Sequence, residues 1–299
     1  MKVLAFGEIL WDVIDGHEHL GGAPFNFAAH SAQCGNESYI VSRLGTDPRG
    51  VRAFQQFKTH RVNPRFVQWD EGHATGTVDV TLTNGQPDYI IHENVAYDFI
   101  DPHHVLTFLN DPRVDVFYFG SLVQRKDVSA RALDVLLESL KARYIFYDVN
   151  LRKHCFTEGI IRKSLDACNV FKLNNEELPV ISKMLMGEDL PMEKFIESLM
   201  VEHPKIKTVI VTAADKGCYV FEKSKPMTHV AGVPVKVADA VGAGDAFSAA
   251  FMHMLGRYGD ALRAAQVANK VGAFVASKHG PIPMYSPDIT ALLNGSDVV

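Results

Sequence analysis

Cysteine is scarce in this sequence, and the few that are present form no motif. They are scattered, at Cys34, Cys155, Cys168 and Cys218, and none belongs to a CxxC pair. This spacing excludes the common zinc and redox motifs. The thirteen histidines likewise include no HExxH motif. Free buried thiols are typical of a reducing compartment, so we expect a cytoplasmic protein.

Long hydrophobic runs and an excess of positive charge are also missing. No apolar segment approaches the roughly 18 residues that a membrane-spanning helix needs. Gly7, Glu8 and Asp12 interrupt the N-terminal apolar run, which is therefore typical of a strand rather than a signal peptide. The formal net charge is −5, without the basic footprint typical of nucleic-acid binding. We expect neither a membrane nor a nucleic acid as a partner.

The elements that the sequence does predict alternate between strand and helix. The 299 residues, 47% of them hydrophobic, suffice for one large α/β domain with a small appendage. Strand-like runs at 2–10 and 38–45 alternate with helical segments at 23–35 and 47–60. This order predicts a mainly parallel central sheet with helices on both faces.

Residues 75–100 interrupt the alternation. They are rich in β-branched residues at alternate positions, and the turn signal Asn84-Gly85 separates two strand-like runs. This pattern predicts a hairpin. We expect it to form a small β appendage with parts of residues 12–22.

A turn poor in side chains precedes an expected helix near the C-terminus. Residues 239–245 (DAVGAGD) place Asp245 in the first turn of that helix, where a carboxylate is favoured. The glycines let backbone N–H groups approach a ligand, and such groups at a helix start bind anions. A base beside an anion site suits phosphoryl transfer to an alcohol. On this segment alone, an ordinary capping aspartate is an equal alternative.

Two familiar glycine-rich nucleotide-binding motifs are absent from the sequence. A dinucleotide-binding fingerprint needs a third glycine where Phe247 stands. Residues 45–51 have the glycine spacing of a phosphate-binding P-loop, but Val51 replaces its lysine.

Other polar groups follow expected helix starts or strand ends. Asn26 follows two glycines at a helix start, and its amide suits sugar hydroxyls. Residues 147–154 lie past the end of an expected parallel strand, where open α/β sheets bind ligands. Asn174 and Glu177 follow the next such strand. The alternative for Asn26 is an exposed side chain at a loop-to-helix junction, and the alternative for each of the other two groups is a solvated turn.

Together these segments resemble the ribokinase-like (PfkB) carbohydrate kinases. That family carries GG-x-x-N near the N-terminus, N-x-x-E, and D-T-x-G-A-G-D near the C-terminus. Residues 21–26 match the first with one extra residue counted from Gly21, 174–177 match the second and 239–245 the third. The resemblance implies a ribokinase-like three-layer α/β/α sandwich with a mainly parallel sheet. Its small β-sheet lid, formed by about 12–22 and 75–100, would cover the sugar.

The resemblance also implies roles for individual residues in an ATP-dependent sugar kinase. Asp245 would be the general base, and an anion hole would be formed by the amides of Gly242, Ala243 and Gly244. The sugar-side residues would be Asp12, Gly22, Asn26, Arg125, Asp148, Asn150 and Arg152. The nucleotide-side residues would be Asn174, Thr212, Ala214, Gly217 and Asn269. Asn174 and Glu177 would order Mg²⁺ through water, and Asp239 with the backbone of Val241 would hold a monovalent cation such as K⁺.

The resemblance leaves the substrate open. The segments GGAP, DVNLR and 118–125 favour the fructokinase branch. A 2-keto-3-deoxygluconate kinase is the main alternative, because Arg125 or Arg152 suits its carboxylate; ribokinase is another. A non-catalytic sugar-binding protein on the same fold is the alternative of a different class. Family members often pair through their lids, so a homodimer is expected.

Two positions depart from the family pattern. Ala240 stands where threonine is usual, and Ala214 stands where glycine is frequent in the nucleotide loop. Neither change removes the expected base or the expected anion hole.

Overall fold

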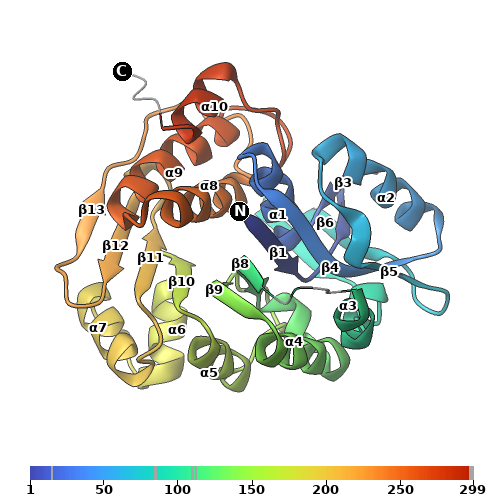
Figure 1. Cartoon of the computed structure of the whole chain (residues 1–299), viewed down its shortest axis with the longest axis horizontal. Coiled ribbons are helices and arrows are strands. Elements are labelled where there is room, and N and C mark those ends of the chain that lie inside the picture. Colours follow the sequence, from blue (N-terminus) through green and yellow to red (C-terminus); the bar gives the residue numbers. More distant parts are fainter. Residues whose placement is uncertain (15, 84–85, 109–110, 112, 296–299) are drawn as a thin grey trace.

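The computed structural model describes residues 1–14, 16–83, 86–108, 111 and 113–295. A central sheet has the strand order β13-β12-β11-β10-β9-β8-β1-β4-β5 and carries helices on both faces (Figure 1). Its strands are β1 (Lys2–Phe6), β4 (Glu37–Gly45), β5 (Val67–Asp70), β8 (Arg113–Gly120), β9 (Lys141–Asp148), β10 (Val170–Asn174), β11 (Thr208–Thr212), β12 (Cys218–Glu222) and β13 (Thr228–Val230).

The helices divide between the two faces of this sheet. On one face lie α1 (Ala23–Gln33), α2 (Pro48–His60), α8 (Ala243–Tyr258), α9 (Ala261–Ala276) and α10 (Pro287–Leu293). On the other lie α4 (Asp127–Ser139), α5 (Glu158–Ala167), α6 (Glu177–Met186) and α7 (Met192–Glu202). The short helix α3 (Pro102–Phe108) precedes β8. The expected three-layer α/β/α sandwich is therefore confirmed.

The pleat of the strands creates two separate cores. Val3 and Ala5 of β1 belong to the core under α1 and α8, whereas Leu4 and Phe6 belong to the core under α4 and α5. Successive side chains of a strand point to opposite faces, so both faces of β1 must be apolar. The sheet is parallel except at β11–β12 and β12–β13, which pair antiparallel.

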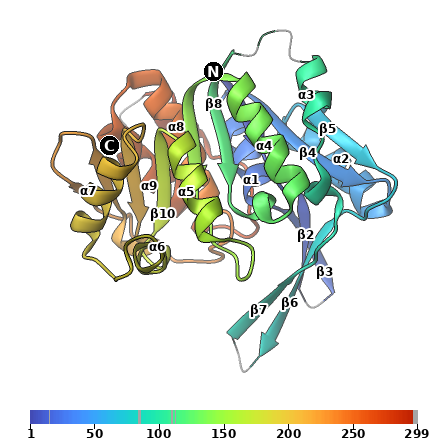
Figure 2. The same cartoon turned by 90° about the horizontal axis from the view of Figure 1, so that it is seen from below.

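A second, four-stranded sheet projects from one end of the body (Figure 2). Its order is β3-β2-β6-β7, from β2 (Leu10–Ile14), β3 (His17–Gly21), β6 (Gly76–Thr83) and β7 (Gln86–Ile91). The expected hairpin is present as the β6–β7 pair. Its expected turn, Asn84-Gly85, lies outside the described residues.

This small sheet is shorter than the expected 75–100 segment. It ends at Ile91, and Ala96–Phe99 form a 3-10 turn in which Tyr97 and Asp98 are fully buried. The chain has left the strand conformation there, and Asp98 pairs with Arg125 of the main body. Among the described residues, no helix is long and apolar enough to cross a membrane.

Candidate active site

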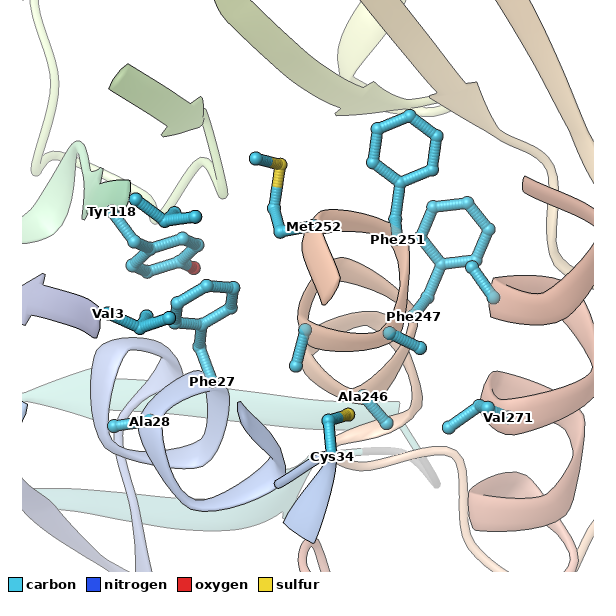
Figure 3. Close-up of a cluster of buried hydrophobic side chains, with 14 of the residues drawn as sticks. Val3, Phe27, Ala28, Cys34, Tyr118, Ala246, Phe247, Phe251, Met252 and Val271 are labelled. Atoms are coloured by element: carbon cyan, nitrogen blue, oxygen red, sulfur yellow. The ribbon is translucent and has the colours of Figure 1, made fainter. Parts of the chain in front are cut away.

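Asp245 and Asn26 meet although they lie near opposite ends of the chain. Asp245 stands in the first turn of α8, and its Oδ2 accepts a hydrogen bond of 2.8 Å from Asn26 Nδ2 of α1. The residues that follow them, Ala246 and Phe27, belong to one buried cluster (Figure 3). Phe27 also stacks on Tyr118 of β8, with ring centroids 4.0 Å apart. Apolar packing of two helices therefore fixes this polar contact.

The environment makes Asp245 an unusually strong base for an aspartate. Burial raises the pKa of Asp245 to about 7, although the Asn26 hydrogen bond lowers it. The negative charge of Asp148 raises the pKa further, while Lys172 and Arg152 lower it. A base with a pKa near the working pH is the most effective proton acceptor.

The turn before Asp245 is held in a conformation that only glycine fits. Gly242 has a φ of +80°, and a Cβ atom there would lie 2.2 Å from the carbonyl oxygen of Pro281. This backbone starts α8 at Ala243, so the N–H groups of the turn stand at a helix N-terminus. The first N–H groups of a helix have no partner within it and attract anions.

Asp12 lies above the glycine pair at residues 21–22. A Cβ atom at Gly21 would lie 2.8 Å from Asp12 Oδ2, and one at Gly22 would lie 2.5 Å from the Glu8 carbonyl oxygen. Burial raises the pKa of Asp12 to about 6, and Arg152 and His19 partly oppose this. The structure thus brings Asp12, Gly22 and Asn26 together at the start of α1, as the sequence predicts.

Glu8 is an acidic residue of this region that the sequence analysis did not select. It is only 3% exposed, and its Oε2 has no partner among the described residues. Burial raises the pKa of Glu8 to about 6, while Arg152 and Arg125 lower it. The signal in the sequence was a carboxylate inside a buried apolar run, which is rare without a functional or structural reason.

Asp148 has a different partner from the one expected. Both of its oxygens accept hydrogen bonds of 2.9 Å from Lys172 Nζ, and its Oδ2 also accepts one from Ser248. Asp148 and Lys172 are 3% and 6% exposed. A buried ammonium group needs a counterion, so we assign Asp148 to this pair rather than to the sugar.

Arg125 is likewise engaged within the protein. It forms a salt bridge to Asp98 at 2.9 Å and donates to the His92 carbonyl oxygen. The side chains of Arg125 and Asp98 are 5% and 0% exposed. We therefore revise its expected role from binding substrate to joining the small sheet to the body.

Arg152 and Asn150 follow β9 in a loop that is not extended. Asn150 has a φ of +41°, so the expected alternation of residues 148, 150 and 152 does not occur. Arg152 is exposed, and its charge acts on Glu8, Asp12 and Asp245. Arg152 is therefore an exposed cation whose charge reaches all three of these acidic residues.

Asn174 and Glu177 brace one another. Asn174 Oδ1 accepts from the N–H groups of Glu176 and Glu177, and Glu177 Oε2 accepts from the Asn174 N–H. Glu177 Oε1 accepts from the Leu151 N–H, which ties two neighbouring strand ends together. Burial raises the pKa of Glu177, and Lys172 partly opposes this.

The other expected nucleotide-side residues lie toward the β11–β13 edge of the sheet. Thr212 ends β11, and Gly217 follows a 3-10 turn (Ala214–Lys216) with a φ of +91°. Asn269 of α9 donates at 3.1 Å to the carbonyl oxygens of Val230, the last residue of β13, and Ala231, which follows it. Asn269 therefore fixes the backbone next to this loop.

Ala214 is strained, and this gives a prediction. It is exposed and has a φ of +49°. Ala214→Gly should raise the free energy of unfolding by about 0.5–1 kcal/mol, since about 1–2 kcal/mol of strain outweighs the freedom gained by the unfolded chain. Urea denaturation measures this. Ala74→Gly, at an exposed loop residue without positive φ, should instead lower stability, and equal effects would refute the explanation.

Asp239 connects the turn at residues 239–244 (the phosphate-side turn) to residues 280–285 (the C-terminal segment). Its Oδ1 accepts from the Val241 N–H at 3.0 Å, and its Oδ2 accepts from the Gly280 N–H at 3.2 Å. Val241 itself is exposed. Within the described part of the chain, no group of three or more His, Cys, Asp or Glu residues is arranged to hold a metal ion.

The fold and this site define a phosphotransferase of the sugar-kinase class. The family model of the pfkB family carbohydrate kinases matches residues 2–288, and the chain belongs to this family. It is therefore an ATP-dependent carbohydrate kinase.

Individual relatives agree with this assignment. The probable fructokinase-6, chloroplastic, of Arabidopsis thaliana is 28% identical over 308 residues, which cover 94% of this chain and 79% of that protein. Fructokinase with bound ATP from Xylella fastidiosa has a TM-score of 0.85 at 21% identity, covering 97% of each chain. Fructokinase from Vibrio cholerae O395 in fructose, ADP and calcium ion bound form has a TM-score of 0.82 at 22% identity, covering 95% of this chain and 96% of that one. These two structures show likeness of fold.

Proposed function

We propose that the protein transfers the γ-phosphate of ATP to a hydroxyl of a neutral hexose, with fructose as the preferred substrate. The observation that carries this is the contact between Asn26 and Asp245 beside the start of α8. It supports the proposal because the carboxylate of Asp245, whose pKa is raised to about 7, lies beside Asn26 at the N-terminus of α8.

In this proposal Asp245 accepts the hydroxyl proton. Deprotonating an alcohol fully beforehand is unfavourable for a carboxylate whose pKa is about 7, so the proton moves as the O–P bond forms. The N–H groups of Gly242, Ala243 and Gly244 stabilise the charge on the phosphates. Asn26 orients the carboxylate toward the hydroxyl through its hydrogen bond.

The N-x-x-E pair suits an ion that is held through water. Each oxygen of Glu177 accepts one backbone N–H, which leaves lone pairs for the water ligands of Mg²⁺. Asn174 and Glu177 would order these waters, and the bound ion would neutralise phosphate charge. Asp239 and the Val241 carbonyl oxygen would serve a monovalent cation such as K⁺ beside the turn.

The charges of the site favour a neutral sugar over an acid. Glu8, Asp12 and Asp245 surround the expected sugar position with acceptors, and a sugar offers hydroxyl donors to them. Arg125 is paired with Asp98, and within the described part of the chain Arg152 is a cation whose charge acts on all three carboxylates. A substrate carboxylate would therefore meet net negative charge.

The small sheet is the proposed lid. Leu10 and Val78 are buried on its inner side together with Tyr97 and Cys155 of the body, so an apolar wall stands next to Asp12. Closure of this sheet would exclude water, which otherwise competes with the sugar as the phosphate acceptor.

A substrate screen tests this function. ATP consumption is measured with fructose, ribose, 2-keto-3-deoxygluconate, nucleosides and sugar phosphates, and fructose should give the highest kcat/KM. A higher value for the acid would contradict the neutral-sugar assignment. Arg152→Gln separates these cases, because it should abolish activity on an acid substrate and change that on fructose far less.

The pH dependence of the reaction is a further prediction. The pKa of Asp245 is about 7 and that of Asp12 about 6, both raised by burial. Because the base must be ionised, kcat/KM should rise with pH and level off above an apparent pKa between about 6 and 7. Steady-state rates from pH 4.5 to 8.5 (about ten values) measure it. An acid limb near the pKa of an ordinary aspartate, about 4, would contradict the burial of Asp245.

A further inference from the structure

Helix α1 contacts the active site at two places one turn apart. Asn26 donates to Asp245, and four residues later the fully buried His30 contacts the C-terminal segment. Residues four apart share one face of a helix. The face that carries Asn26 therefore also carries a fully buried histidine.

Both nitrogens of His30 have partners. Nε2 lies 2.9 Å from the Pro281 carbonyl oxygen, and Nδ1 lies 2.9 Å from the Tyr285 hydroxyl. A carbonyl can only accept, so Nε2 carries the hydrogen and Nδ1 accepts from Tyr285. Burial lowers the pKa of His30 to about 4, although the bond to Pro281 opposes this. The ring is thus neutral at neutral pH, and this pair of bonds is fixed.

Pro281 packs directly against the phosphate-side turn. A Cβ atom on Gly242 would lie 2.2 Å from the Pro281 carbonyl oxygen, so this oxygen rests directly on the turn. The adjacent Gly280 donates to Asp239, at the other end of the same turn. A shift of the Pro281 carbonyl would therefore displace the backbone of the turn.

Gln33 provides a second attachment of the C-terminal segment to α1. Gln33, also on α1, donates to the Pro283 carbonyl oxygen at 3.1 Å and accepts from the Tyr285 N–H at 2.9 Å. Gln33 holds the segment, whereas among the described residues it is His30 that donates to the carbonyl oxygen touching Gly242. Loss of His30 should therefore move the turn without releasing the whole segment.

We propose that His30 is a positioning residue that sets the phosphate-binding turn by holding the Pro281 carbonyl against Gly242. Through Asn26 and His30, one helix then aligns both the base and the backbone amides that face the phosphates. This inference rests on the proposed function, since the contact of that turn with ATP is itself part of the proposal. An ordinary buried histidine that only fills space is the alternative.

A matched pair of variants separates positioning from packing. In His30→Gln the amide nitrogen can take the place of Nε2 and keep the bond to Pro281, whereas in His30→Asn the shorter amide reaches only toward Tyr285. Asparagine is one methylene group smaller than glutamine, so His30→Asn also loses more packing, and the separate titrations with ADP and with fructose distinguish that loss from the loss of the bond to Pro281. Tyr285→Phe is the control, because it removes the hydroxyl and leaves the bond between His30 and Pro281 in place.

Nucleotide and sugar binding are measured separately by calorimetric titration with ADP and with fructose, together with the KM for each substrate and kcat. His30→Asn should weaken ADP binding and raise the KM for ATP about tenfold, the size expected when a buried carbonyl loses its donor. Fructose binding should change less than about twofold, because Asn26 is untouched. His30→Gln and Tyr285→Phe should stay near the wild type in ADP binding.

Two results would overturn the proposal. One is a His30→Asn protein that binds ADP as the wild type does, with only its melting temperature lowered, since packing alone predicts this. The other is an equal loss of ADP affinity in all three variants, which would assign the effect to the segment as a whole. The ADP titrations remain decisive even where no sugar in the screen is phosphorylated, a result that would refute the proposed function instead.

Discussion

Asp245→Asn should lose about 10²–10⁴-fold in kcat, the range for removing a general base. Asparagine is close in size, and its oxygen can still accept from Asn26, so the contact between α1 and α8 should survive. What disappears is the group that takes the hydroxyl proton. Steady-state kinetics with saturating ATP and fructose measure this, and a turnover near that of the wild type would refute the assignment.

The same variant provides its own control for folding. Burial raises the pKa of Asp245 from 3.8 in an exposed aspartate to about 7, so the folded state binds this proton more tightly than the unfolded state. Ionising the buried Asp245 is therefore unfavourable. Its contribution to the stability of the wild type is fully present below about pH 4 and is lost as the pH rises to about 7. Relative to the wild type, Asp245→Asn should gain stability over that interval. If the variant is inactive yet more stable than the wild type at pH 8, it has lost the proton-accepting group while keeping its fold.

The parts of the site that were predictable from sequence are those encoded in short segments. Asn26 and Asp245 each follow glycines at a helix start, and that pattern fixes the local backbone. The alternation of strands and helices then fixes which ends of the strands meet. Both inferences need only local sequence and the general rules of α/β folds.

The ion pairs of the site were not predictable in this way. The sequence assigns Asp148 to the sugar because residues 147–154 stand at the end of an expected parallel strand, whereas Arg125 is assigned through the family resemblance. Whether such a side chain points to the ligand or into the core depends on its partner on another strand or loop. Lys172 and Asp98 are those partners, and nothing in the local sequence connects each pair.

Backbone conformation caused a further difference. The alternation of residues 148, 150 and 152 indicates a common direction only while the chain stays extended. Asn150 adopts the left-handed region, which asparagine tolerates better than most residues, and the chain turns there. Arg152 therefore faces the acidic residues, while Asp148 stays in the core.

The buried pair of Lys172 and Asp148 leads to the second large effect. Lys172→Met should lower the free energy of unfolding by about 3–5 kcal/mol, because it leaves Asp148 buried without a counterion. Burial alone would lower the pKa of Lys172, but Asp148 raises it above its ordinary value, so the ammonium group of Lys172 is charged throughout the neutral range. Denaturation in urea at pH 7 measures the loss.

The sign of the pH dependence tests the cause. An unpaired buried carboxyl binds a proton more tightly than it does in the unfolded chain, so the deficit of Lys172→Met should shrink as the pH falls toward 5. A packing defect would not depend on pH in this way. The double variant Lys172→Met, Asp148→Asn removes both charges and should recover most of the lost stability, because an uncharged pair has no comparable desolvation cost. The single variant Asp148→Asn completes the comparison. If the double variant loses as much stability as Lys172→Met and Asp148→Asn together, Lys172 stabilises the fold through its own packing, and the charge of Asp148 is balanced elsewhere.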